Sequence, residues 1–245
     1  MNDSADDSSF TAVAWAAVAG WREAVHTMPF IRALADGSLP TDAFAFYLAQ
    51  DAAYLVEFAR ALSAASVLAP HVRAQAFFGT SARNALEVET TLHRDWLSGH
   101  GSPVVGEPSP VTSAYTNHLL ASCLGGSYPV VVAAVLPCYR LYAHIGEELL
   151  RQAGDLTGHP YRRWIATYAD PGFQKAAWQA CQLTDEAAEG TDDATWARML
   201  AAFERSSMHE YLFFDQGISQ PRWPLPPGPK AVLEAPVRDG PLSGP

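Results

Sequence analysis

Thr41–Leu68 reads TDAFAFYLAQDAAYLVEFARALSAASVL, and this stretch decides the fold class of the chain. Large apolar residues recur in it every three or four positions, which is the period of an amphipathic α-helix and not the alternation of a strand. Gly37 and Pro40 stand just before it and mark its approach. The apolar stripe consists of Phe44, Tyr47, Leu48, Leu55, Phe58 and Leu62. We therefore predict one long helix with a single buried face.

The rest of the chain continues in this way, with Ala-rich segments of helical spacing and Gly or Pro at the joints. Pro137 falls inside one of these segments and predicts a kink beside Cys138. Further helices are expected from about Ser81 to Leu97, Ser109 to Gly125, Ser127 to Gly154, Pro160 to Asp170, Phe173 to Ala188 and Asp193 to Ile218. The prediction is an all-α chain with one domain over residues 10–219, a disordered segment 1–9 and a Pro-rich tail 220–245.

Composition excludes several classes of partner. The 245 residues are 49% hydrophobic and 17% charged, enough to bury one substantial core. A net charge of -10 opposes binding to nucleic acid or to an anionic membrane surface. The longest apolar stretch, Pro129–Cys138, is too short to span a bilayer, and Asp3, Asp6 and Asp7 stand where an export signal carries positive charge. We expect a cytoplasmic protein.

Three side chains that carry chemistry project from apolar stripes. Asp51 falls within about 20° of Phe44 on the helical wheel, and Glu210 continues the stripe of Phe203. Cys138 lies on an apolar stripe of its own helix at the expected kink. Buried carboxylates are costly unless they are paired, so two of them on different helices indicate a shared cavity. The alternative is that each carboxylate is a satisfied structural group and the thiol an inert core residue.

Tyrosines accompany these groups. Tyr54 follows Asp51 by three residues, Tyr115 and Tyr142 lie on the inner faces of their helices, and Tyr168 continues another apolar stripe. Phenols and carboxylates that line apolar walls suit a flat heteroaromatic ligand, although each tyrosine taken alone also fits ordinary core packing.

Metal and cofactor chemistry find little support. Glu89 and His93 stand at i and i+4, and Glu210 adjoins His209, but His209 points about 100° away from Glu210 on the wheel. Glycine-rich nucleotide motifs and serine-hydrolase or zincin signatures are absent, and the three cysteines form no C-x-x-C pair, so neither a zinc site nor a disulfide framework is indicated. We expect no cofactor and no metal.

Residues 29–69, PFIRALADGSLPTDAFAFYLAQDAAYLVEFARALSAASVLA, closely resemble the opening helices of the TenA family, the thiaminase II proteins. The run F-x-x-Y-L-x-Q-D-x-x-Y-L is the most specific part. Ser113–Leu120 with Tyr115, Ala133–Cys138 leading to Tyr142, and Glu210 with Phe213 agree in order and spacing. The likeness covers roughly residues 15–218.

The resemblance implies a haem-oxygenase-like helical bundle and a homotetramer without cofactor. It makes Cys138 the nucleophile and Glu210 the acid/base group, with Asp51 holding the amino edge of a pyrimidine. It also implies that the ring is surrounded by Tyr54, Tyr115, Tyr142, Tyr168 and Phe213. The intact Leu-Pro-Cys motif favours the cysteine-containing branch, an aminopyrimidine aminohydrolase that releases 4-amino-5-hydroxymethyl-2-methylpyrimidine from its aminomethyl analogue or from thiamin, in thiamin salvage.

Two features leave room for other interpretations. Phe58 lacks a hydroxyl that some relatives carry, and Tyr211 and Phe214 stand where tryptophans are expected, which puts substrate preference in doubt. The competing hypotheses are a di-metal oxidase on the same bundle and a non-catalytic pyrimidine-binding or regulatory protein. For the catalytic hypothesis we expect burial to raise the pKa of Glu210, so that it can exchange protons with Cys138 and the substrate.

Overall fold

The computed structural model describes residues 8–89 and 107–224. Every regular element in these two ranges is helical, which confirms the all-α prediction. The helices are α1 (Phe10–Ala17), α2 (Ala19–Thr27), α3 (Pro29–Asp36), α4 (Thr41–Leu68), α5 (Val72–Asn84), a π-helical turn η1 (Ala85–Glu89), α7 (Pro110–Leu124), α8 (Tyr128–Ala153), α9 (Arg162–Tyr168), α10 (Pro171–Ala188) and α11 (Asp193–Ser219).

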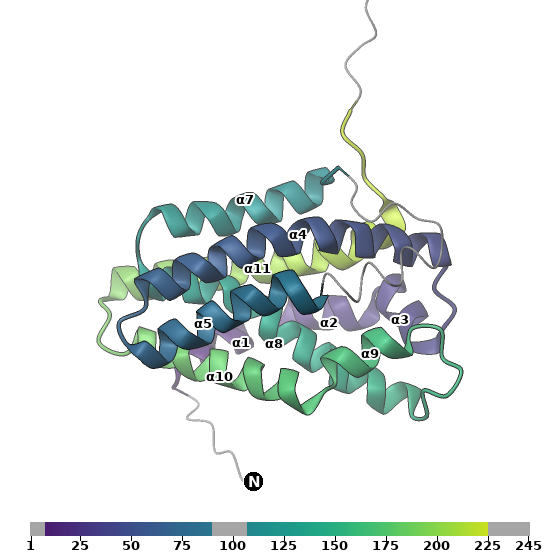
Figure 1. Ribbon diagram of the computed structural model, residues 1–245, viewed down its shortest axis with the longest axis horizontal. Helices are drawn as coiled ribbons and strands as arrows, with labels where there is room; N and C mark the ends of the chain where they lie inside the picture. The colour runs from purple at the N-terminus through teal and green to yellow at the C-terminus, as the bar shows by residue number, and fades with distance from the viewer. Residues whose placement is uncertain (1–7, 90–106, 225–245) are drawn as a thin grey trace, which may run out of the picture.

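The long helices lie roughly along the length of the bundle, with α7 on one edge and α9 and α10 on the other (Figure 1). Helix α8 packs most extensively against α11 and α10, whereas α4 packs most extensively against α5 and α7. Helices α4, α8 and α11 also contact one another, so their facing sides form the centre of the core. Any site built from these three helices is therefore enclosed by protein.

Local sequence signals set the ends of α7 and α8 as predicted. The Ser109 hydroxyl accepts a hydrogen bond of 3.1 Å from the backbone N–H of Thr112, and Pro110 occupies the first turn of α7. Helix α8 runs through Pro137 and ends before Gly154, which adopts a positive φ of 65°. Since α8 carries Cys138, these signals also place the thiol.

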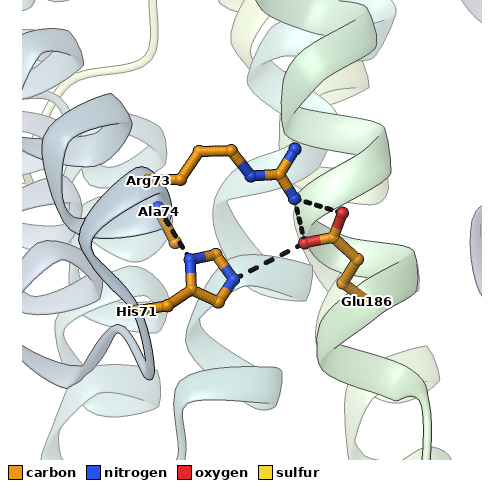
Figure 2. Close-up of polar contacts among 4 residues, drawn as sticks. All are labelled: His71, Arg73, Ala74 and Glu186. Atoms are coloured by element: carbon orange, nitrogen blue, oxygen red, sulfur yellow. Dashed lines mark hydrogen bonds and ion pairs between the residues drawn. The ribbon is translucent and has the colours of Figure 1, made fainter.

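The helix expected from Ser81 begins instead at Val72, so the predicted start of α5 was wrong. His71 caps it: the Nδ1 atom accepts a hydrogen bond of 3.2 Å from the Ala74 N–H. Histidine is not a usual capping residue, so the sequence gives no start signal here. Glu186 of α10 accepts hydrogen bonds from Arg73 and lies 3.5 Å from the Nε2 atom of His71, which ties the start of α5 to α10 (Figure 2).

Helix α8 is the one described helix long and apolar enough to cross a membrane by length and composition. The helix has 26 residues and extends well beyond the apolar stretch Pro129–Cys138, which by itself is too short to span a bilayer. However, 72% of its apolar window is buried inside the bundle, where it serves as a core helix.

Each end of the domain differs from the prediction in one detail. Ser9 caps α1 by accepting a hydrogen bond of 3.2 Å from the Ala12 N–H, so the chain is ordered from this point. At the other end, the Trp223 indole N–H donates a hydrogen bond of 2.9 Å to the Pro108 carbonyl. The beginning of the tail is therefore attached to the segment before α7, while residues 1–7 and 225–245 lie outside the described ranges.

Candidate active site

A cavity of about 100 Å³ lies between α4, α5, α8, α9 and α10. Four of the predicted site residues line it: Asp51 from α4, Cys138 and Tyr142 from α8, and Tyr168 from α9. The rest of its wall is largely apolar and is formed by Leu55, Phe58, Leu62, Ser81, Asn84, Ala85, Tyr139, Phe173 and Ala176. Protein cavities of about 150 Å³ accept a benzene ring, so this space approaches the size of one flat ring.

Cys138 stands at the boundary between the core and the cavity. The side chain is half-buried and packs against the hydrophobic core, and its residue lines the cavity. Pro137 immediately precedes it and removes one intrahelical N–H from this turn. Cys123, Cys138 and Cys181 form no disulfide bond.

Tyr168 reaches the cavity because a glycine faces it. A Cβ atom at Gly146 of α8 would lie 2.4 Å from the carbonyl carbon of Tyr168. Real side chains do not tolerate such an approach, so only glycine allows the end of α9 to lie directly on α8. The Tyr168 ring then packs against Tyr142, with ring centroids 4.7 Å apart.

Glu210 lies behind the cavity wall and does not line it, which corrects the expectation that both carboxylates border one cavity. Only 1% of its surface is exposed. The Tyr115 hydroxyl donates a hydrogen bond of 2.6 Å to its Oε1 atom. Three other predicted site residues are also buried behind the wall and fill the space in front of Glu210: Tyr54, Tyr115 and Phe213. Their places depend on side-chain packing, which helical spacing does not reveal.

Burial controls the protonation of Glu210. Desolvation and the charge of Asp51 raise the pKa of Glu210 to about 8, although the hydrogen bond from Tyr115 lowers it. The expected direction is therefore confirmed. At neutral pH most of the population carries the proton, and a small ionised fraction can accept one.

Tyr54 and Tyr115 form a layer between the sulfur and the acid. Their ring centroids are 4.9 Å apart, and Phe213 packs 5.3 Å from Tyr54. Desolvation raises the pKa of both phenols well above the ordinary value, and negative charge on either Cys138 or Glu210 raises it further. Both groups therefore lie close to the same two neutral hydroxyls. The Tyr54 and Tyr115 hydroxyls also interact with each other.

Tyr47 belongs to the site although sequence reasoning assigned it only to the apolar stripe. It is completely buried, and its hydroxyl lies 2.9 Å from that of Tyr142. Burial and the nearby Asp51 raise the pKa of Tyr47 well above its ordinary value. Its position one turn before Asp51 is the signal that could have identified it.

Metal ligands do not gather in the described part of the chain. No group of three His, Cys, Asp or Glu residues with suitable geometry occurs there. His209 stacks on Tyr115 at 5.2 Å, and burial with the charges of His118 and Arg205 lowers its pKa to about 4. Glu89 and His93, whose spacing resembles part of a metal site, lie outside the residues whose side chains are described.

The bundle and its enclosed site define a haem-oxygenase-like helical protein. A domain of unknown function with a heme oxygenase-like fold from Shewanella denitrificans superposes with a TM-score of 0.68 at 14% identity, covering 86% of this chain and 92% of that chain. A TenA family transcription regulator from Silicibacter sp. TM1040 superposes with a TM-score of 0.76 at 27% identity, covering 85% and 95%.

The chain belongs to the TENA/THI-4/PQQC family, which matches residues 15–220 and confirms the resemblance. It is 33% identical over 212 residues to the aminopyrimidine aminohydrolase of Bacillus subtilis, covering 84% of this chain and 89% of that protein. It is also 38% identical over 212 residues to the thiamine biosynthesis multifunctional protein ThiED of Corynebacterium efficiens. That match covers 86% of this chain but 28% of the longer protein, so the chain spans little more than a quarter of this relative.

Proposed function

We propose that the protein is a cysteine-dependent aminopyrimidine aminohydrolase of the thiaminase II type. It hydrolyses 4-amino-5-aminomethyl-2-methylpyrimidine, and thiamin, to 4-amino-5-hydroxymethyl-2-methylpyrimidine, in salvage of the pyrimidine part of thiamin. The observation that carries the proposal is the presence of Cys138 and Asp51 on the walls of one nearly ring-sized cavity, backed by an acid, Glu210, with a pKa near 8. The name of the Bacillus subtilis relative agrees with it.

The residues that line the cavity define how the substrate is bound. The Asp51 carboxylate accepts hydrogen bonds from the exocyclic amino group and thereby orients the ring. The aromatic side chains of Tyr142, Tyr168 and Phe58 cover its faces and keep water away. A pyrimidine is attacked only after a ring nitrogen gains a proton, so binding must bring this nitrogen within reach of an acid.

In the first step the thiol proton of Cys138 passes through the hydroxyls of Tyr54 and Tyr115 to the ionised fraction of Glu210, and a proton returns by the same hydroxyls to the ring nitrogen. The Tyr115 hydroxyl, bonded to Glu210, is placed to hand on the proton. The sulfur forms a bond to the adjacent ring carbon while an electron pair of the ring moves to the protonated nitrogen. The aromatic ring is thereby converted into an enamine-like adduct.

The adduct then expels the substituent on the methylene carbon, as ammonia from the protonated aminomethyl group, or as the neutral thiazole when thiamin is the substrate. Water adds to the same carbon and gives up a proton to Glu210. The sulfur leaves with its bonding electrons, the ring becomes aromatic again, and the thiol recovers its proton. Glu210 then loses its proton and returns to the ionised form, so the balance for the protonated aminomethyl substrate is one water consumed and one ammonium ion released.

The test incubates the purified protein with each substrate and follows the hydroxymethyl product by chromatography. We expect product from the wild type, and binding without product from Cys138→Ser. Cys123→Ser is the matched control, because Cys123 is also half-buried but does not line the cavity.

Saturable binding without product in the wild type would favour a pyrimidine-binding or regulatory protein. Loss of activity with a chelator and recovery with metal would favour the oxidase hypothesis.

A further inference from the structure

Polar contacts connect α7 and α11 at three levels, in antiparallel order. Near the start of α7, the Ser109 hydroxyl donates a hydrogen bond of 2.7 Å to Gln216. Tyr115 donates one of 2.6 Å to Glu210. One further turn along α7, the Nε2 atom of His118 lies 3.1 Å from the hydroxyl of Ser206. The bond to Glu210 is thus held between two flanking contacts.

The contact of His118 with Ser206 has a defined direction. The Nε2 atom also lies 3.3 Å from the carbonyl oxygen of Ala202, which can only accept. Nε2 therefore carries the ring proton, and Ser206 accepts from it. Burial lowers the pKa of His118, which keeps the ring neutral. The single hydroxyl proton of Ser206 is free to be donated elsewhere.

Ser206 donates that proton to α8. Its hydroxyl forms a hydrogen bond of 2.7 Å with the carbonyl oxygen of Ala134, and Ser206 is fully buried. One side chain of α11 therefore connects α7 with α8. Because α8 and α11 are among the most extensively packed pairs, this bond lies at the centre of the core.

The positions of Ser206 and Ala134 along their helices link this hydrogen bond to the candidate active site. Ser206 precedes Glu210 by four residues, and Ala134 precedes Cys138 by four residues, so each lies one helical turn before a reactive side chain. The turn from Ala134 to Cys138 contains Pro137, whose missing N–H leaves this part of α8 with one fewer internal hydrogen bond. The Ser206 hydroxyl adds a bond from outside the helix at the Ala134 carbonyl, next to the Ala133 carbonyl whose helical partner Pro137 removes.

We propose that Ser206 is a positioning residue that sets the separation of Cys138 from Glu210, an inference that rests on the function proposed above. Its hydroxyl fixes the weakened turn of α8 against the turn of α11 that precedes the acid. Without it the proline-containing turn can shift relative to α11, and the sulfur and the carboxyl lose their alignment. A small misplacement of reacting groups costs about 10- to 100-fold in rate.

Ser206→Ala is a mild substitution in other respects. The Ala134 carbonyl keeps its ordinary helical partner, the Cys138 N–H, and the His118 N–H keeps the Ala202 carbonyl. No buried polar group is left without a partner, so we expect the variant to fold.

The chain offers a matched control in the next residue. Ser207 is also fully buried on α11, but its hydroxyl donates to the Phe203 carbonyl of the same helix at 2.9 Å. Ser207→Ala therefore removes the same atom and one buried hydrogen bond without touching α8. Both variants should lower the melting temperature to a similar extent.

The experiment measures kcat, KM and the pH profile with the aminomethyl pyrimidine, and the rate at which iodoacetamide alkylates Cys138, read by mass spectrometry of its peptide. For Ser206→Ala we expect kcat to fall about 10- to 100-fold with little change in KM, and the alkylation rate at neutral pH to change by about threefold or more. For Ser207→Ala we expect less than about a twofold change in either quantity.

Equal behaviour of the two variants in turnover and in alkylation would overturn the role of Ser206. Failure of the proposed function has a different signature, namely no product from the wild type with either substrate. The alkylation comparison does not depend on turnover, so it decides the role of Ser206 in that case as well.

Discussion

The Tyr115 hydroxyl donates a 2.6 Å hydrogen bond to Glu210, and this bond opposes the effect of burial on the same carboxyl. Burial and Asp51 raise the pKa of Glu210, whereas the phenol stabilises the carboxylate and lowers it. The net result, a pKa of about 8, shows that desolvation prevails. The proton affinity of the acid is therefore adjustable through a single neighbouring hydroxyl.

Tyr115→Phe should raise the pKa of Glu210 above about 8. A hydrogen bond to a charged group contributes roughly 1.5–3 kcal/mol, so we expect a shift of about one pH unit or more. The measurement is the pH profile of kcat/KM, in which the limb that reports the titration of Glu210 moves to higher pH. Tyr54→Phe is the control, because its hydroxyl is not bonded to Glu210, and an equal shift in that variant would contradict the assignment.

Glu210→Gln should abolish turnover but stabilise the fold at alkaline pH. In the folded protein Glu210 keeps its proton up to about pH 8, whereas the unfolded chain releases it near 4.5. Folding therefore takes up a proton between these pH values, so the free energy of unfolding falls as the pH rises through this window. Glutamine removes the penalty, and we expect a gain on the order of 4 kcal/mol at pH 8 over the wild type.

Urea unfolding at pH 5 and pH 8 measures this difference. Glu204→Gln on the exposed side of α11 is the control and should leave the pH dependence of stability unchanged. A Glu210→Gln variant whose stability declines with pH as steeply as that of the wild type would show that Glu210 does not hold a proton in the folded state.

Gly146→Ala should damage both stability and substrate binding. The added Cβ would meet the backbone of Tyr168 at 2.4 Å, so α9 must move away from α8 and carry Tyr168 out of the cavity wall. Overpacking of this kind costs about 1–3 kcal/mol, and KM should rise. Gly20→Ala, where nothing lies within 4 Å of the new Cβ, should leave both unchanged. Thermal unfolding and kinetics of the two variants test the comparison.

Glu186→Gln should have only a small effect. The ion pair with Arg73 joins α5 to α10, but the side chains are 52% and 38% exposed for Arg73 and Glu186. Solvent screens such pairs, so the loss of stability should be small and should diminish in high salt. Melting temperatures at low and high ionic strength check this, and turnover should remain within the range of the wild type.

Local patterns determined much of the fold. The period of Thr41–Leu68 predicted the bounds of α4, and Ser109 and Gly154 marked the ends of α7 and α8, because caps and helical periodicity depend on residues close in sequence. The start of α5 was missed because His71 is an unusual cap and its other partner, Glu186, lies far along the chain.

The sequence by itself also determined which side chains face the core, since Asp51 and Glu210 are buried as their helical positions require. It could not determine which of them borders the cavity. That depends on how Tyr54, Tyr115 and Phe213 fill the space between α4, α7 and α11. Only the tertiary structure places Glu210 behind a phenol and Cys138 on the open wall, because contacts between distant segments are fixed by packing and not by the spacing within one helix.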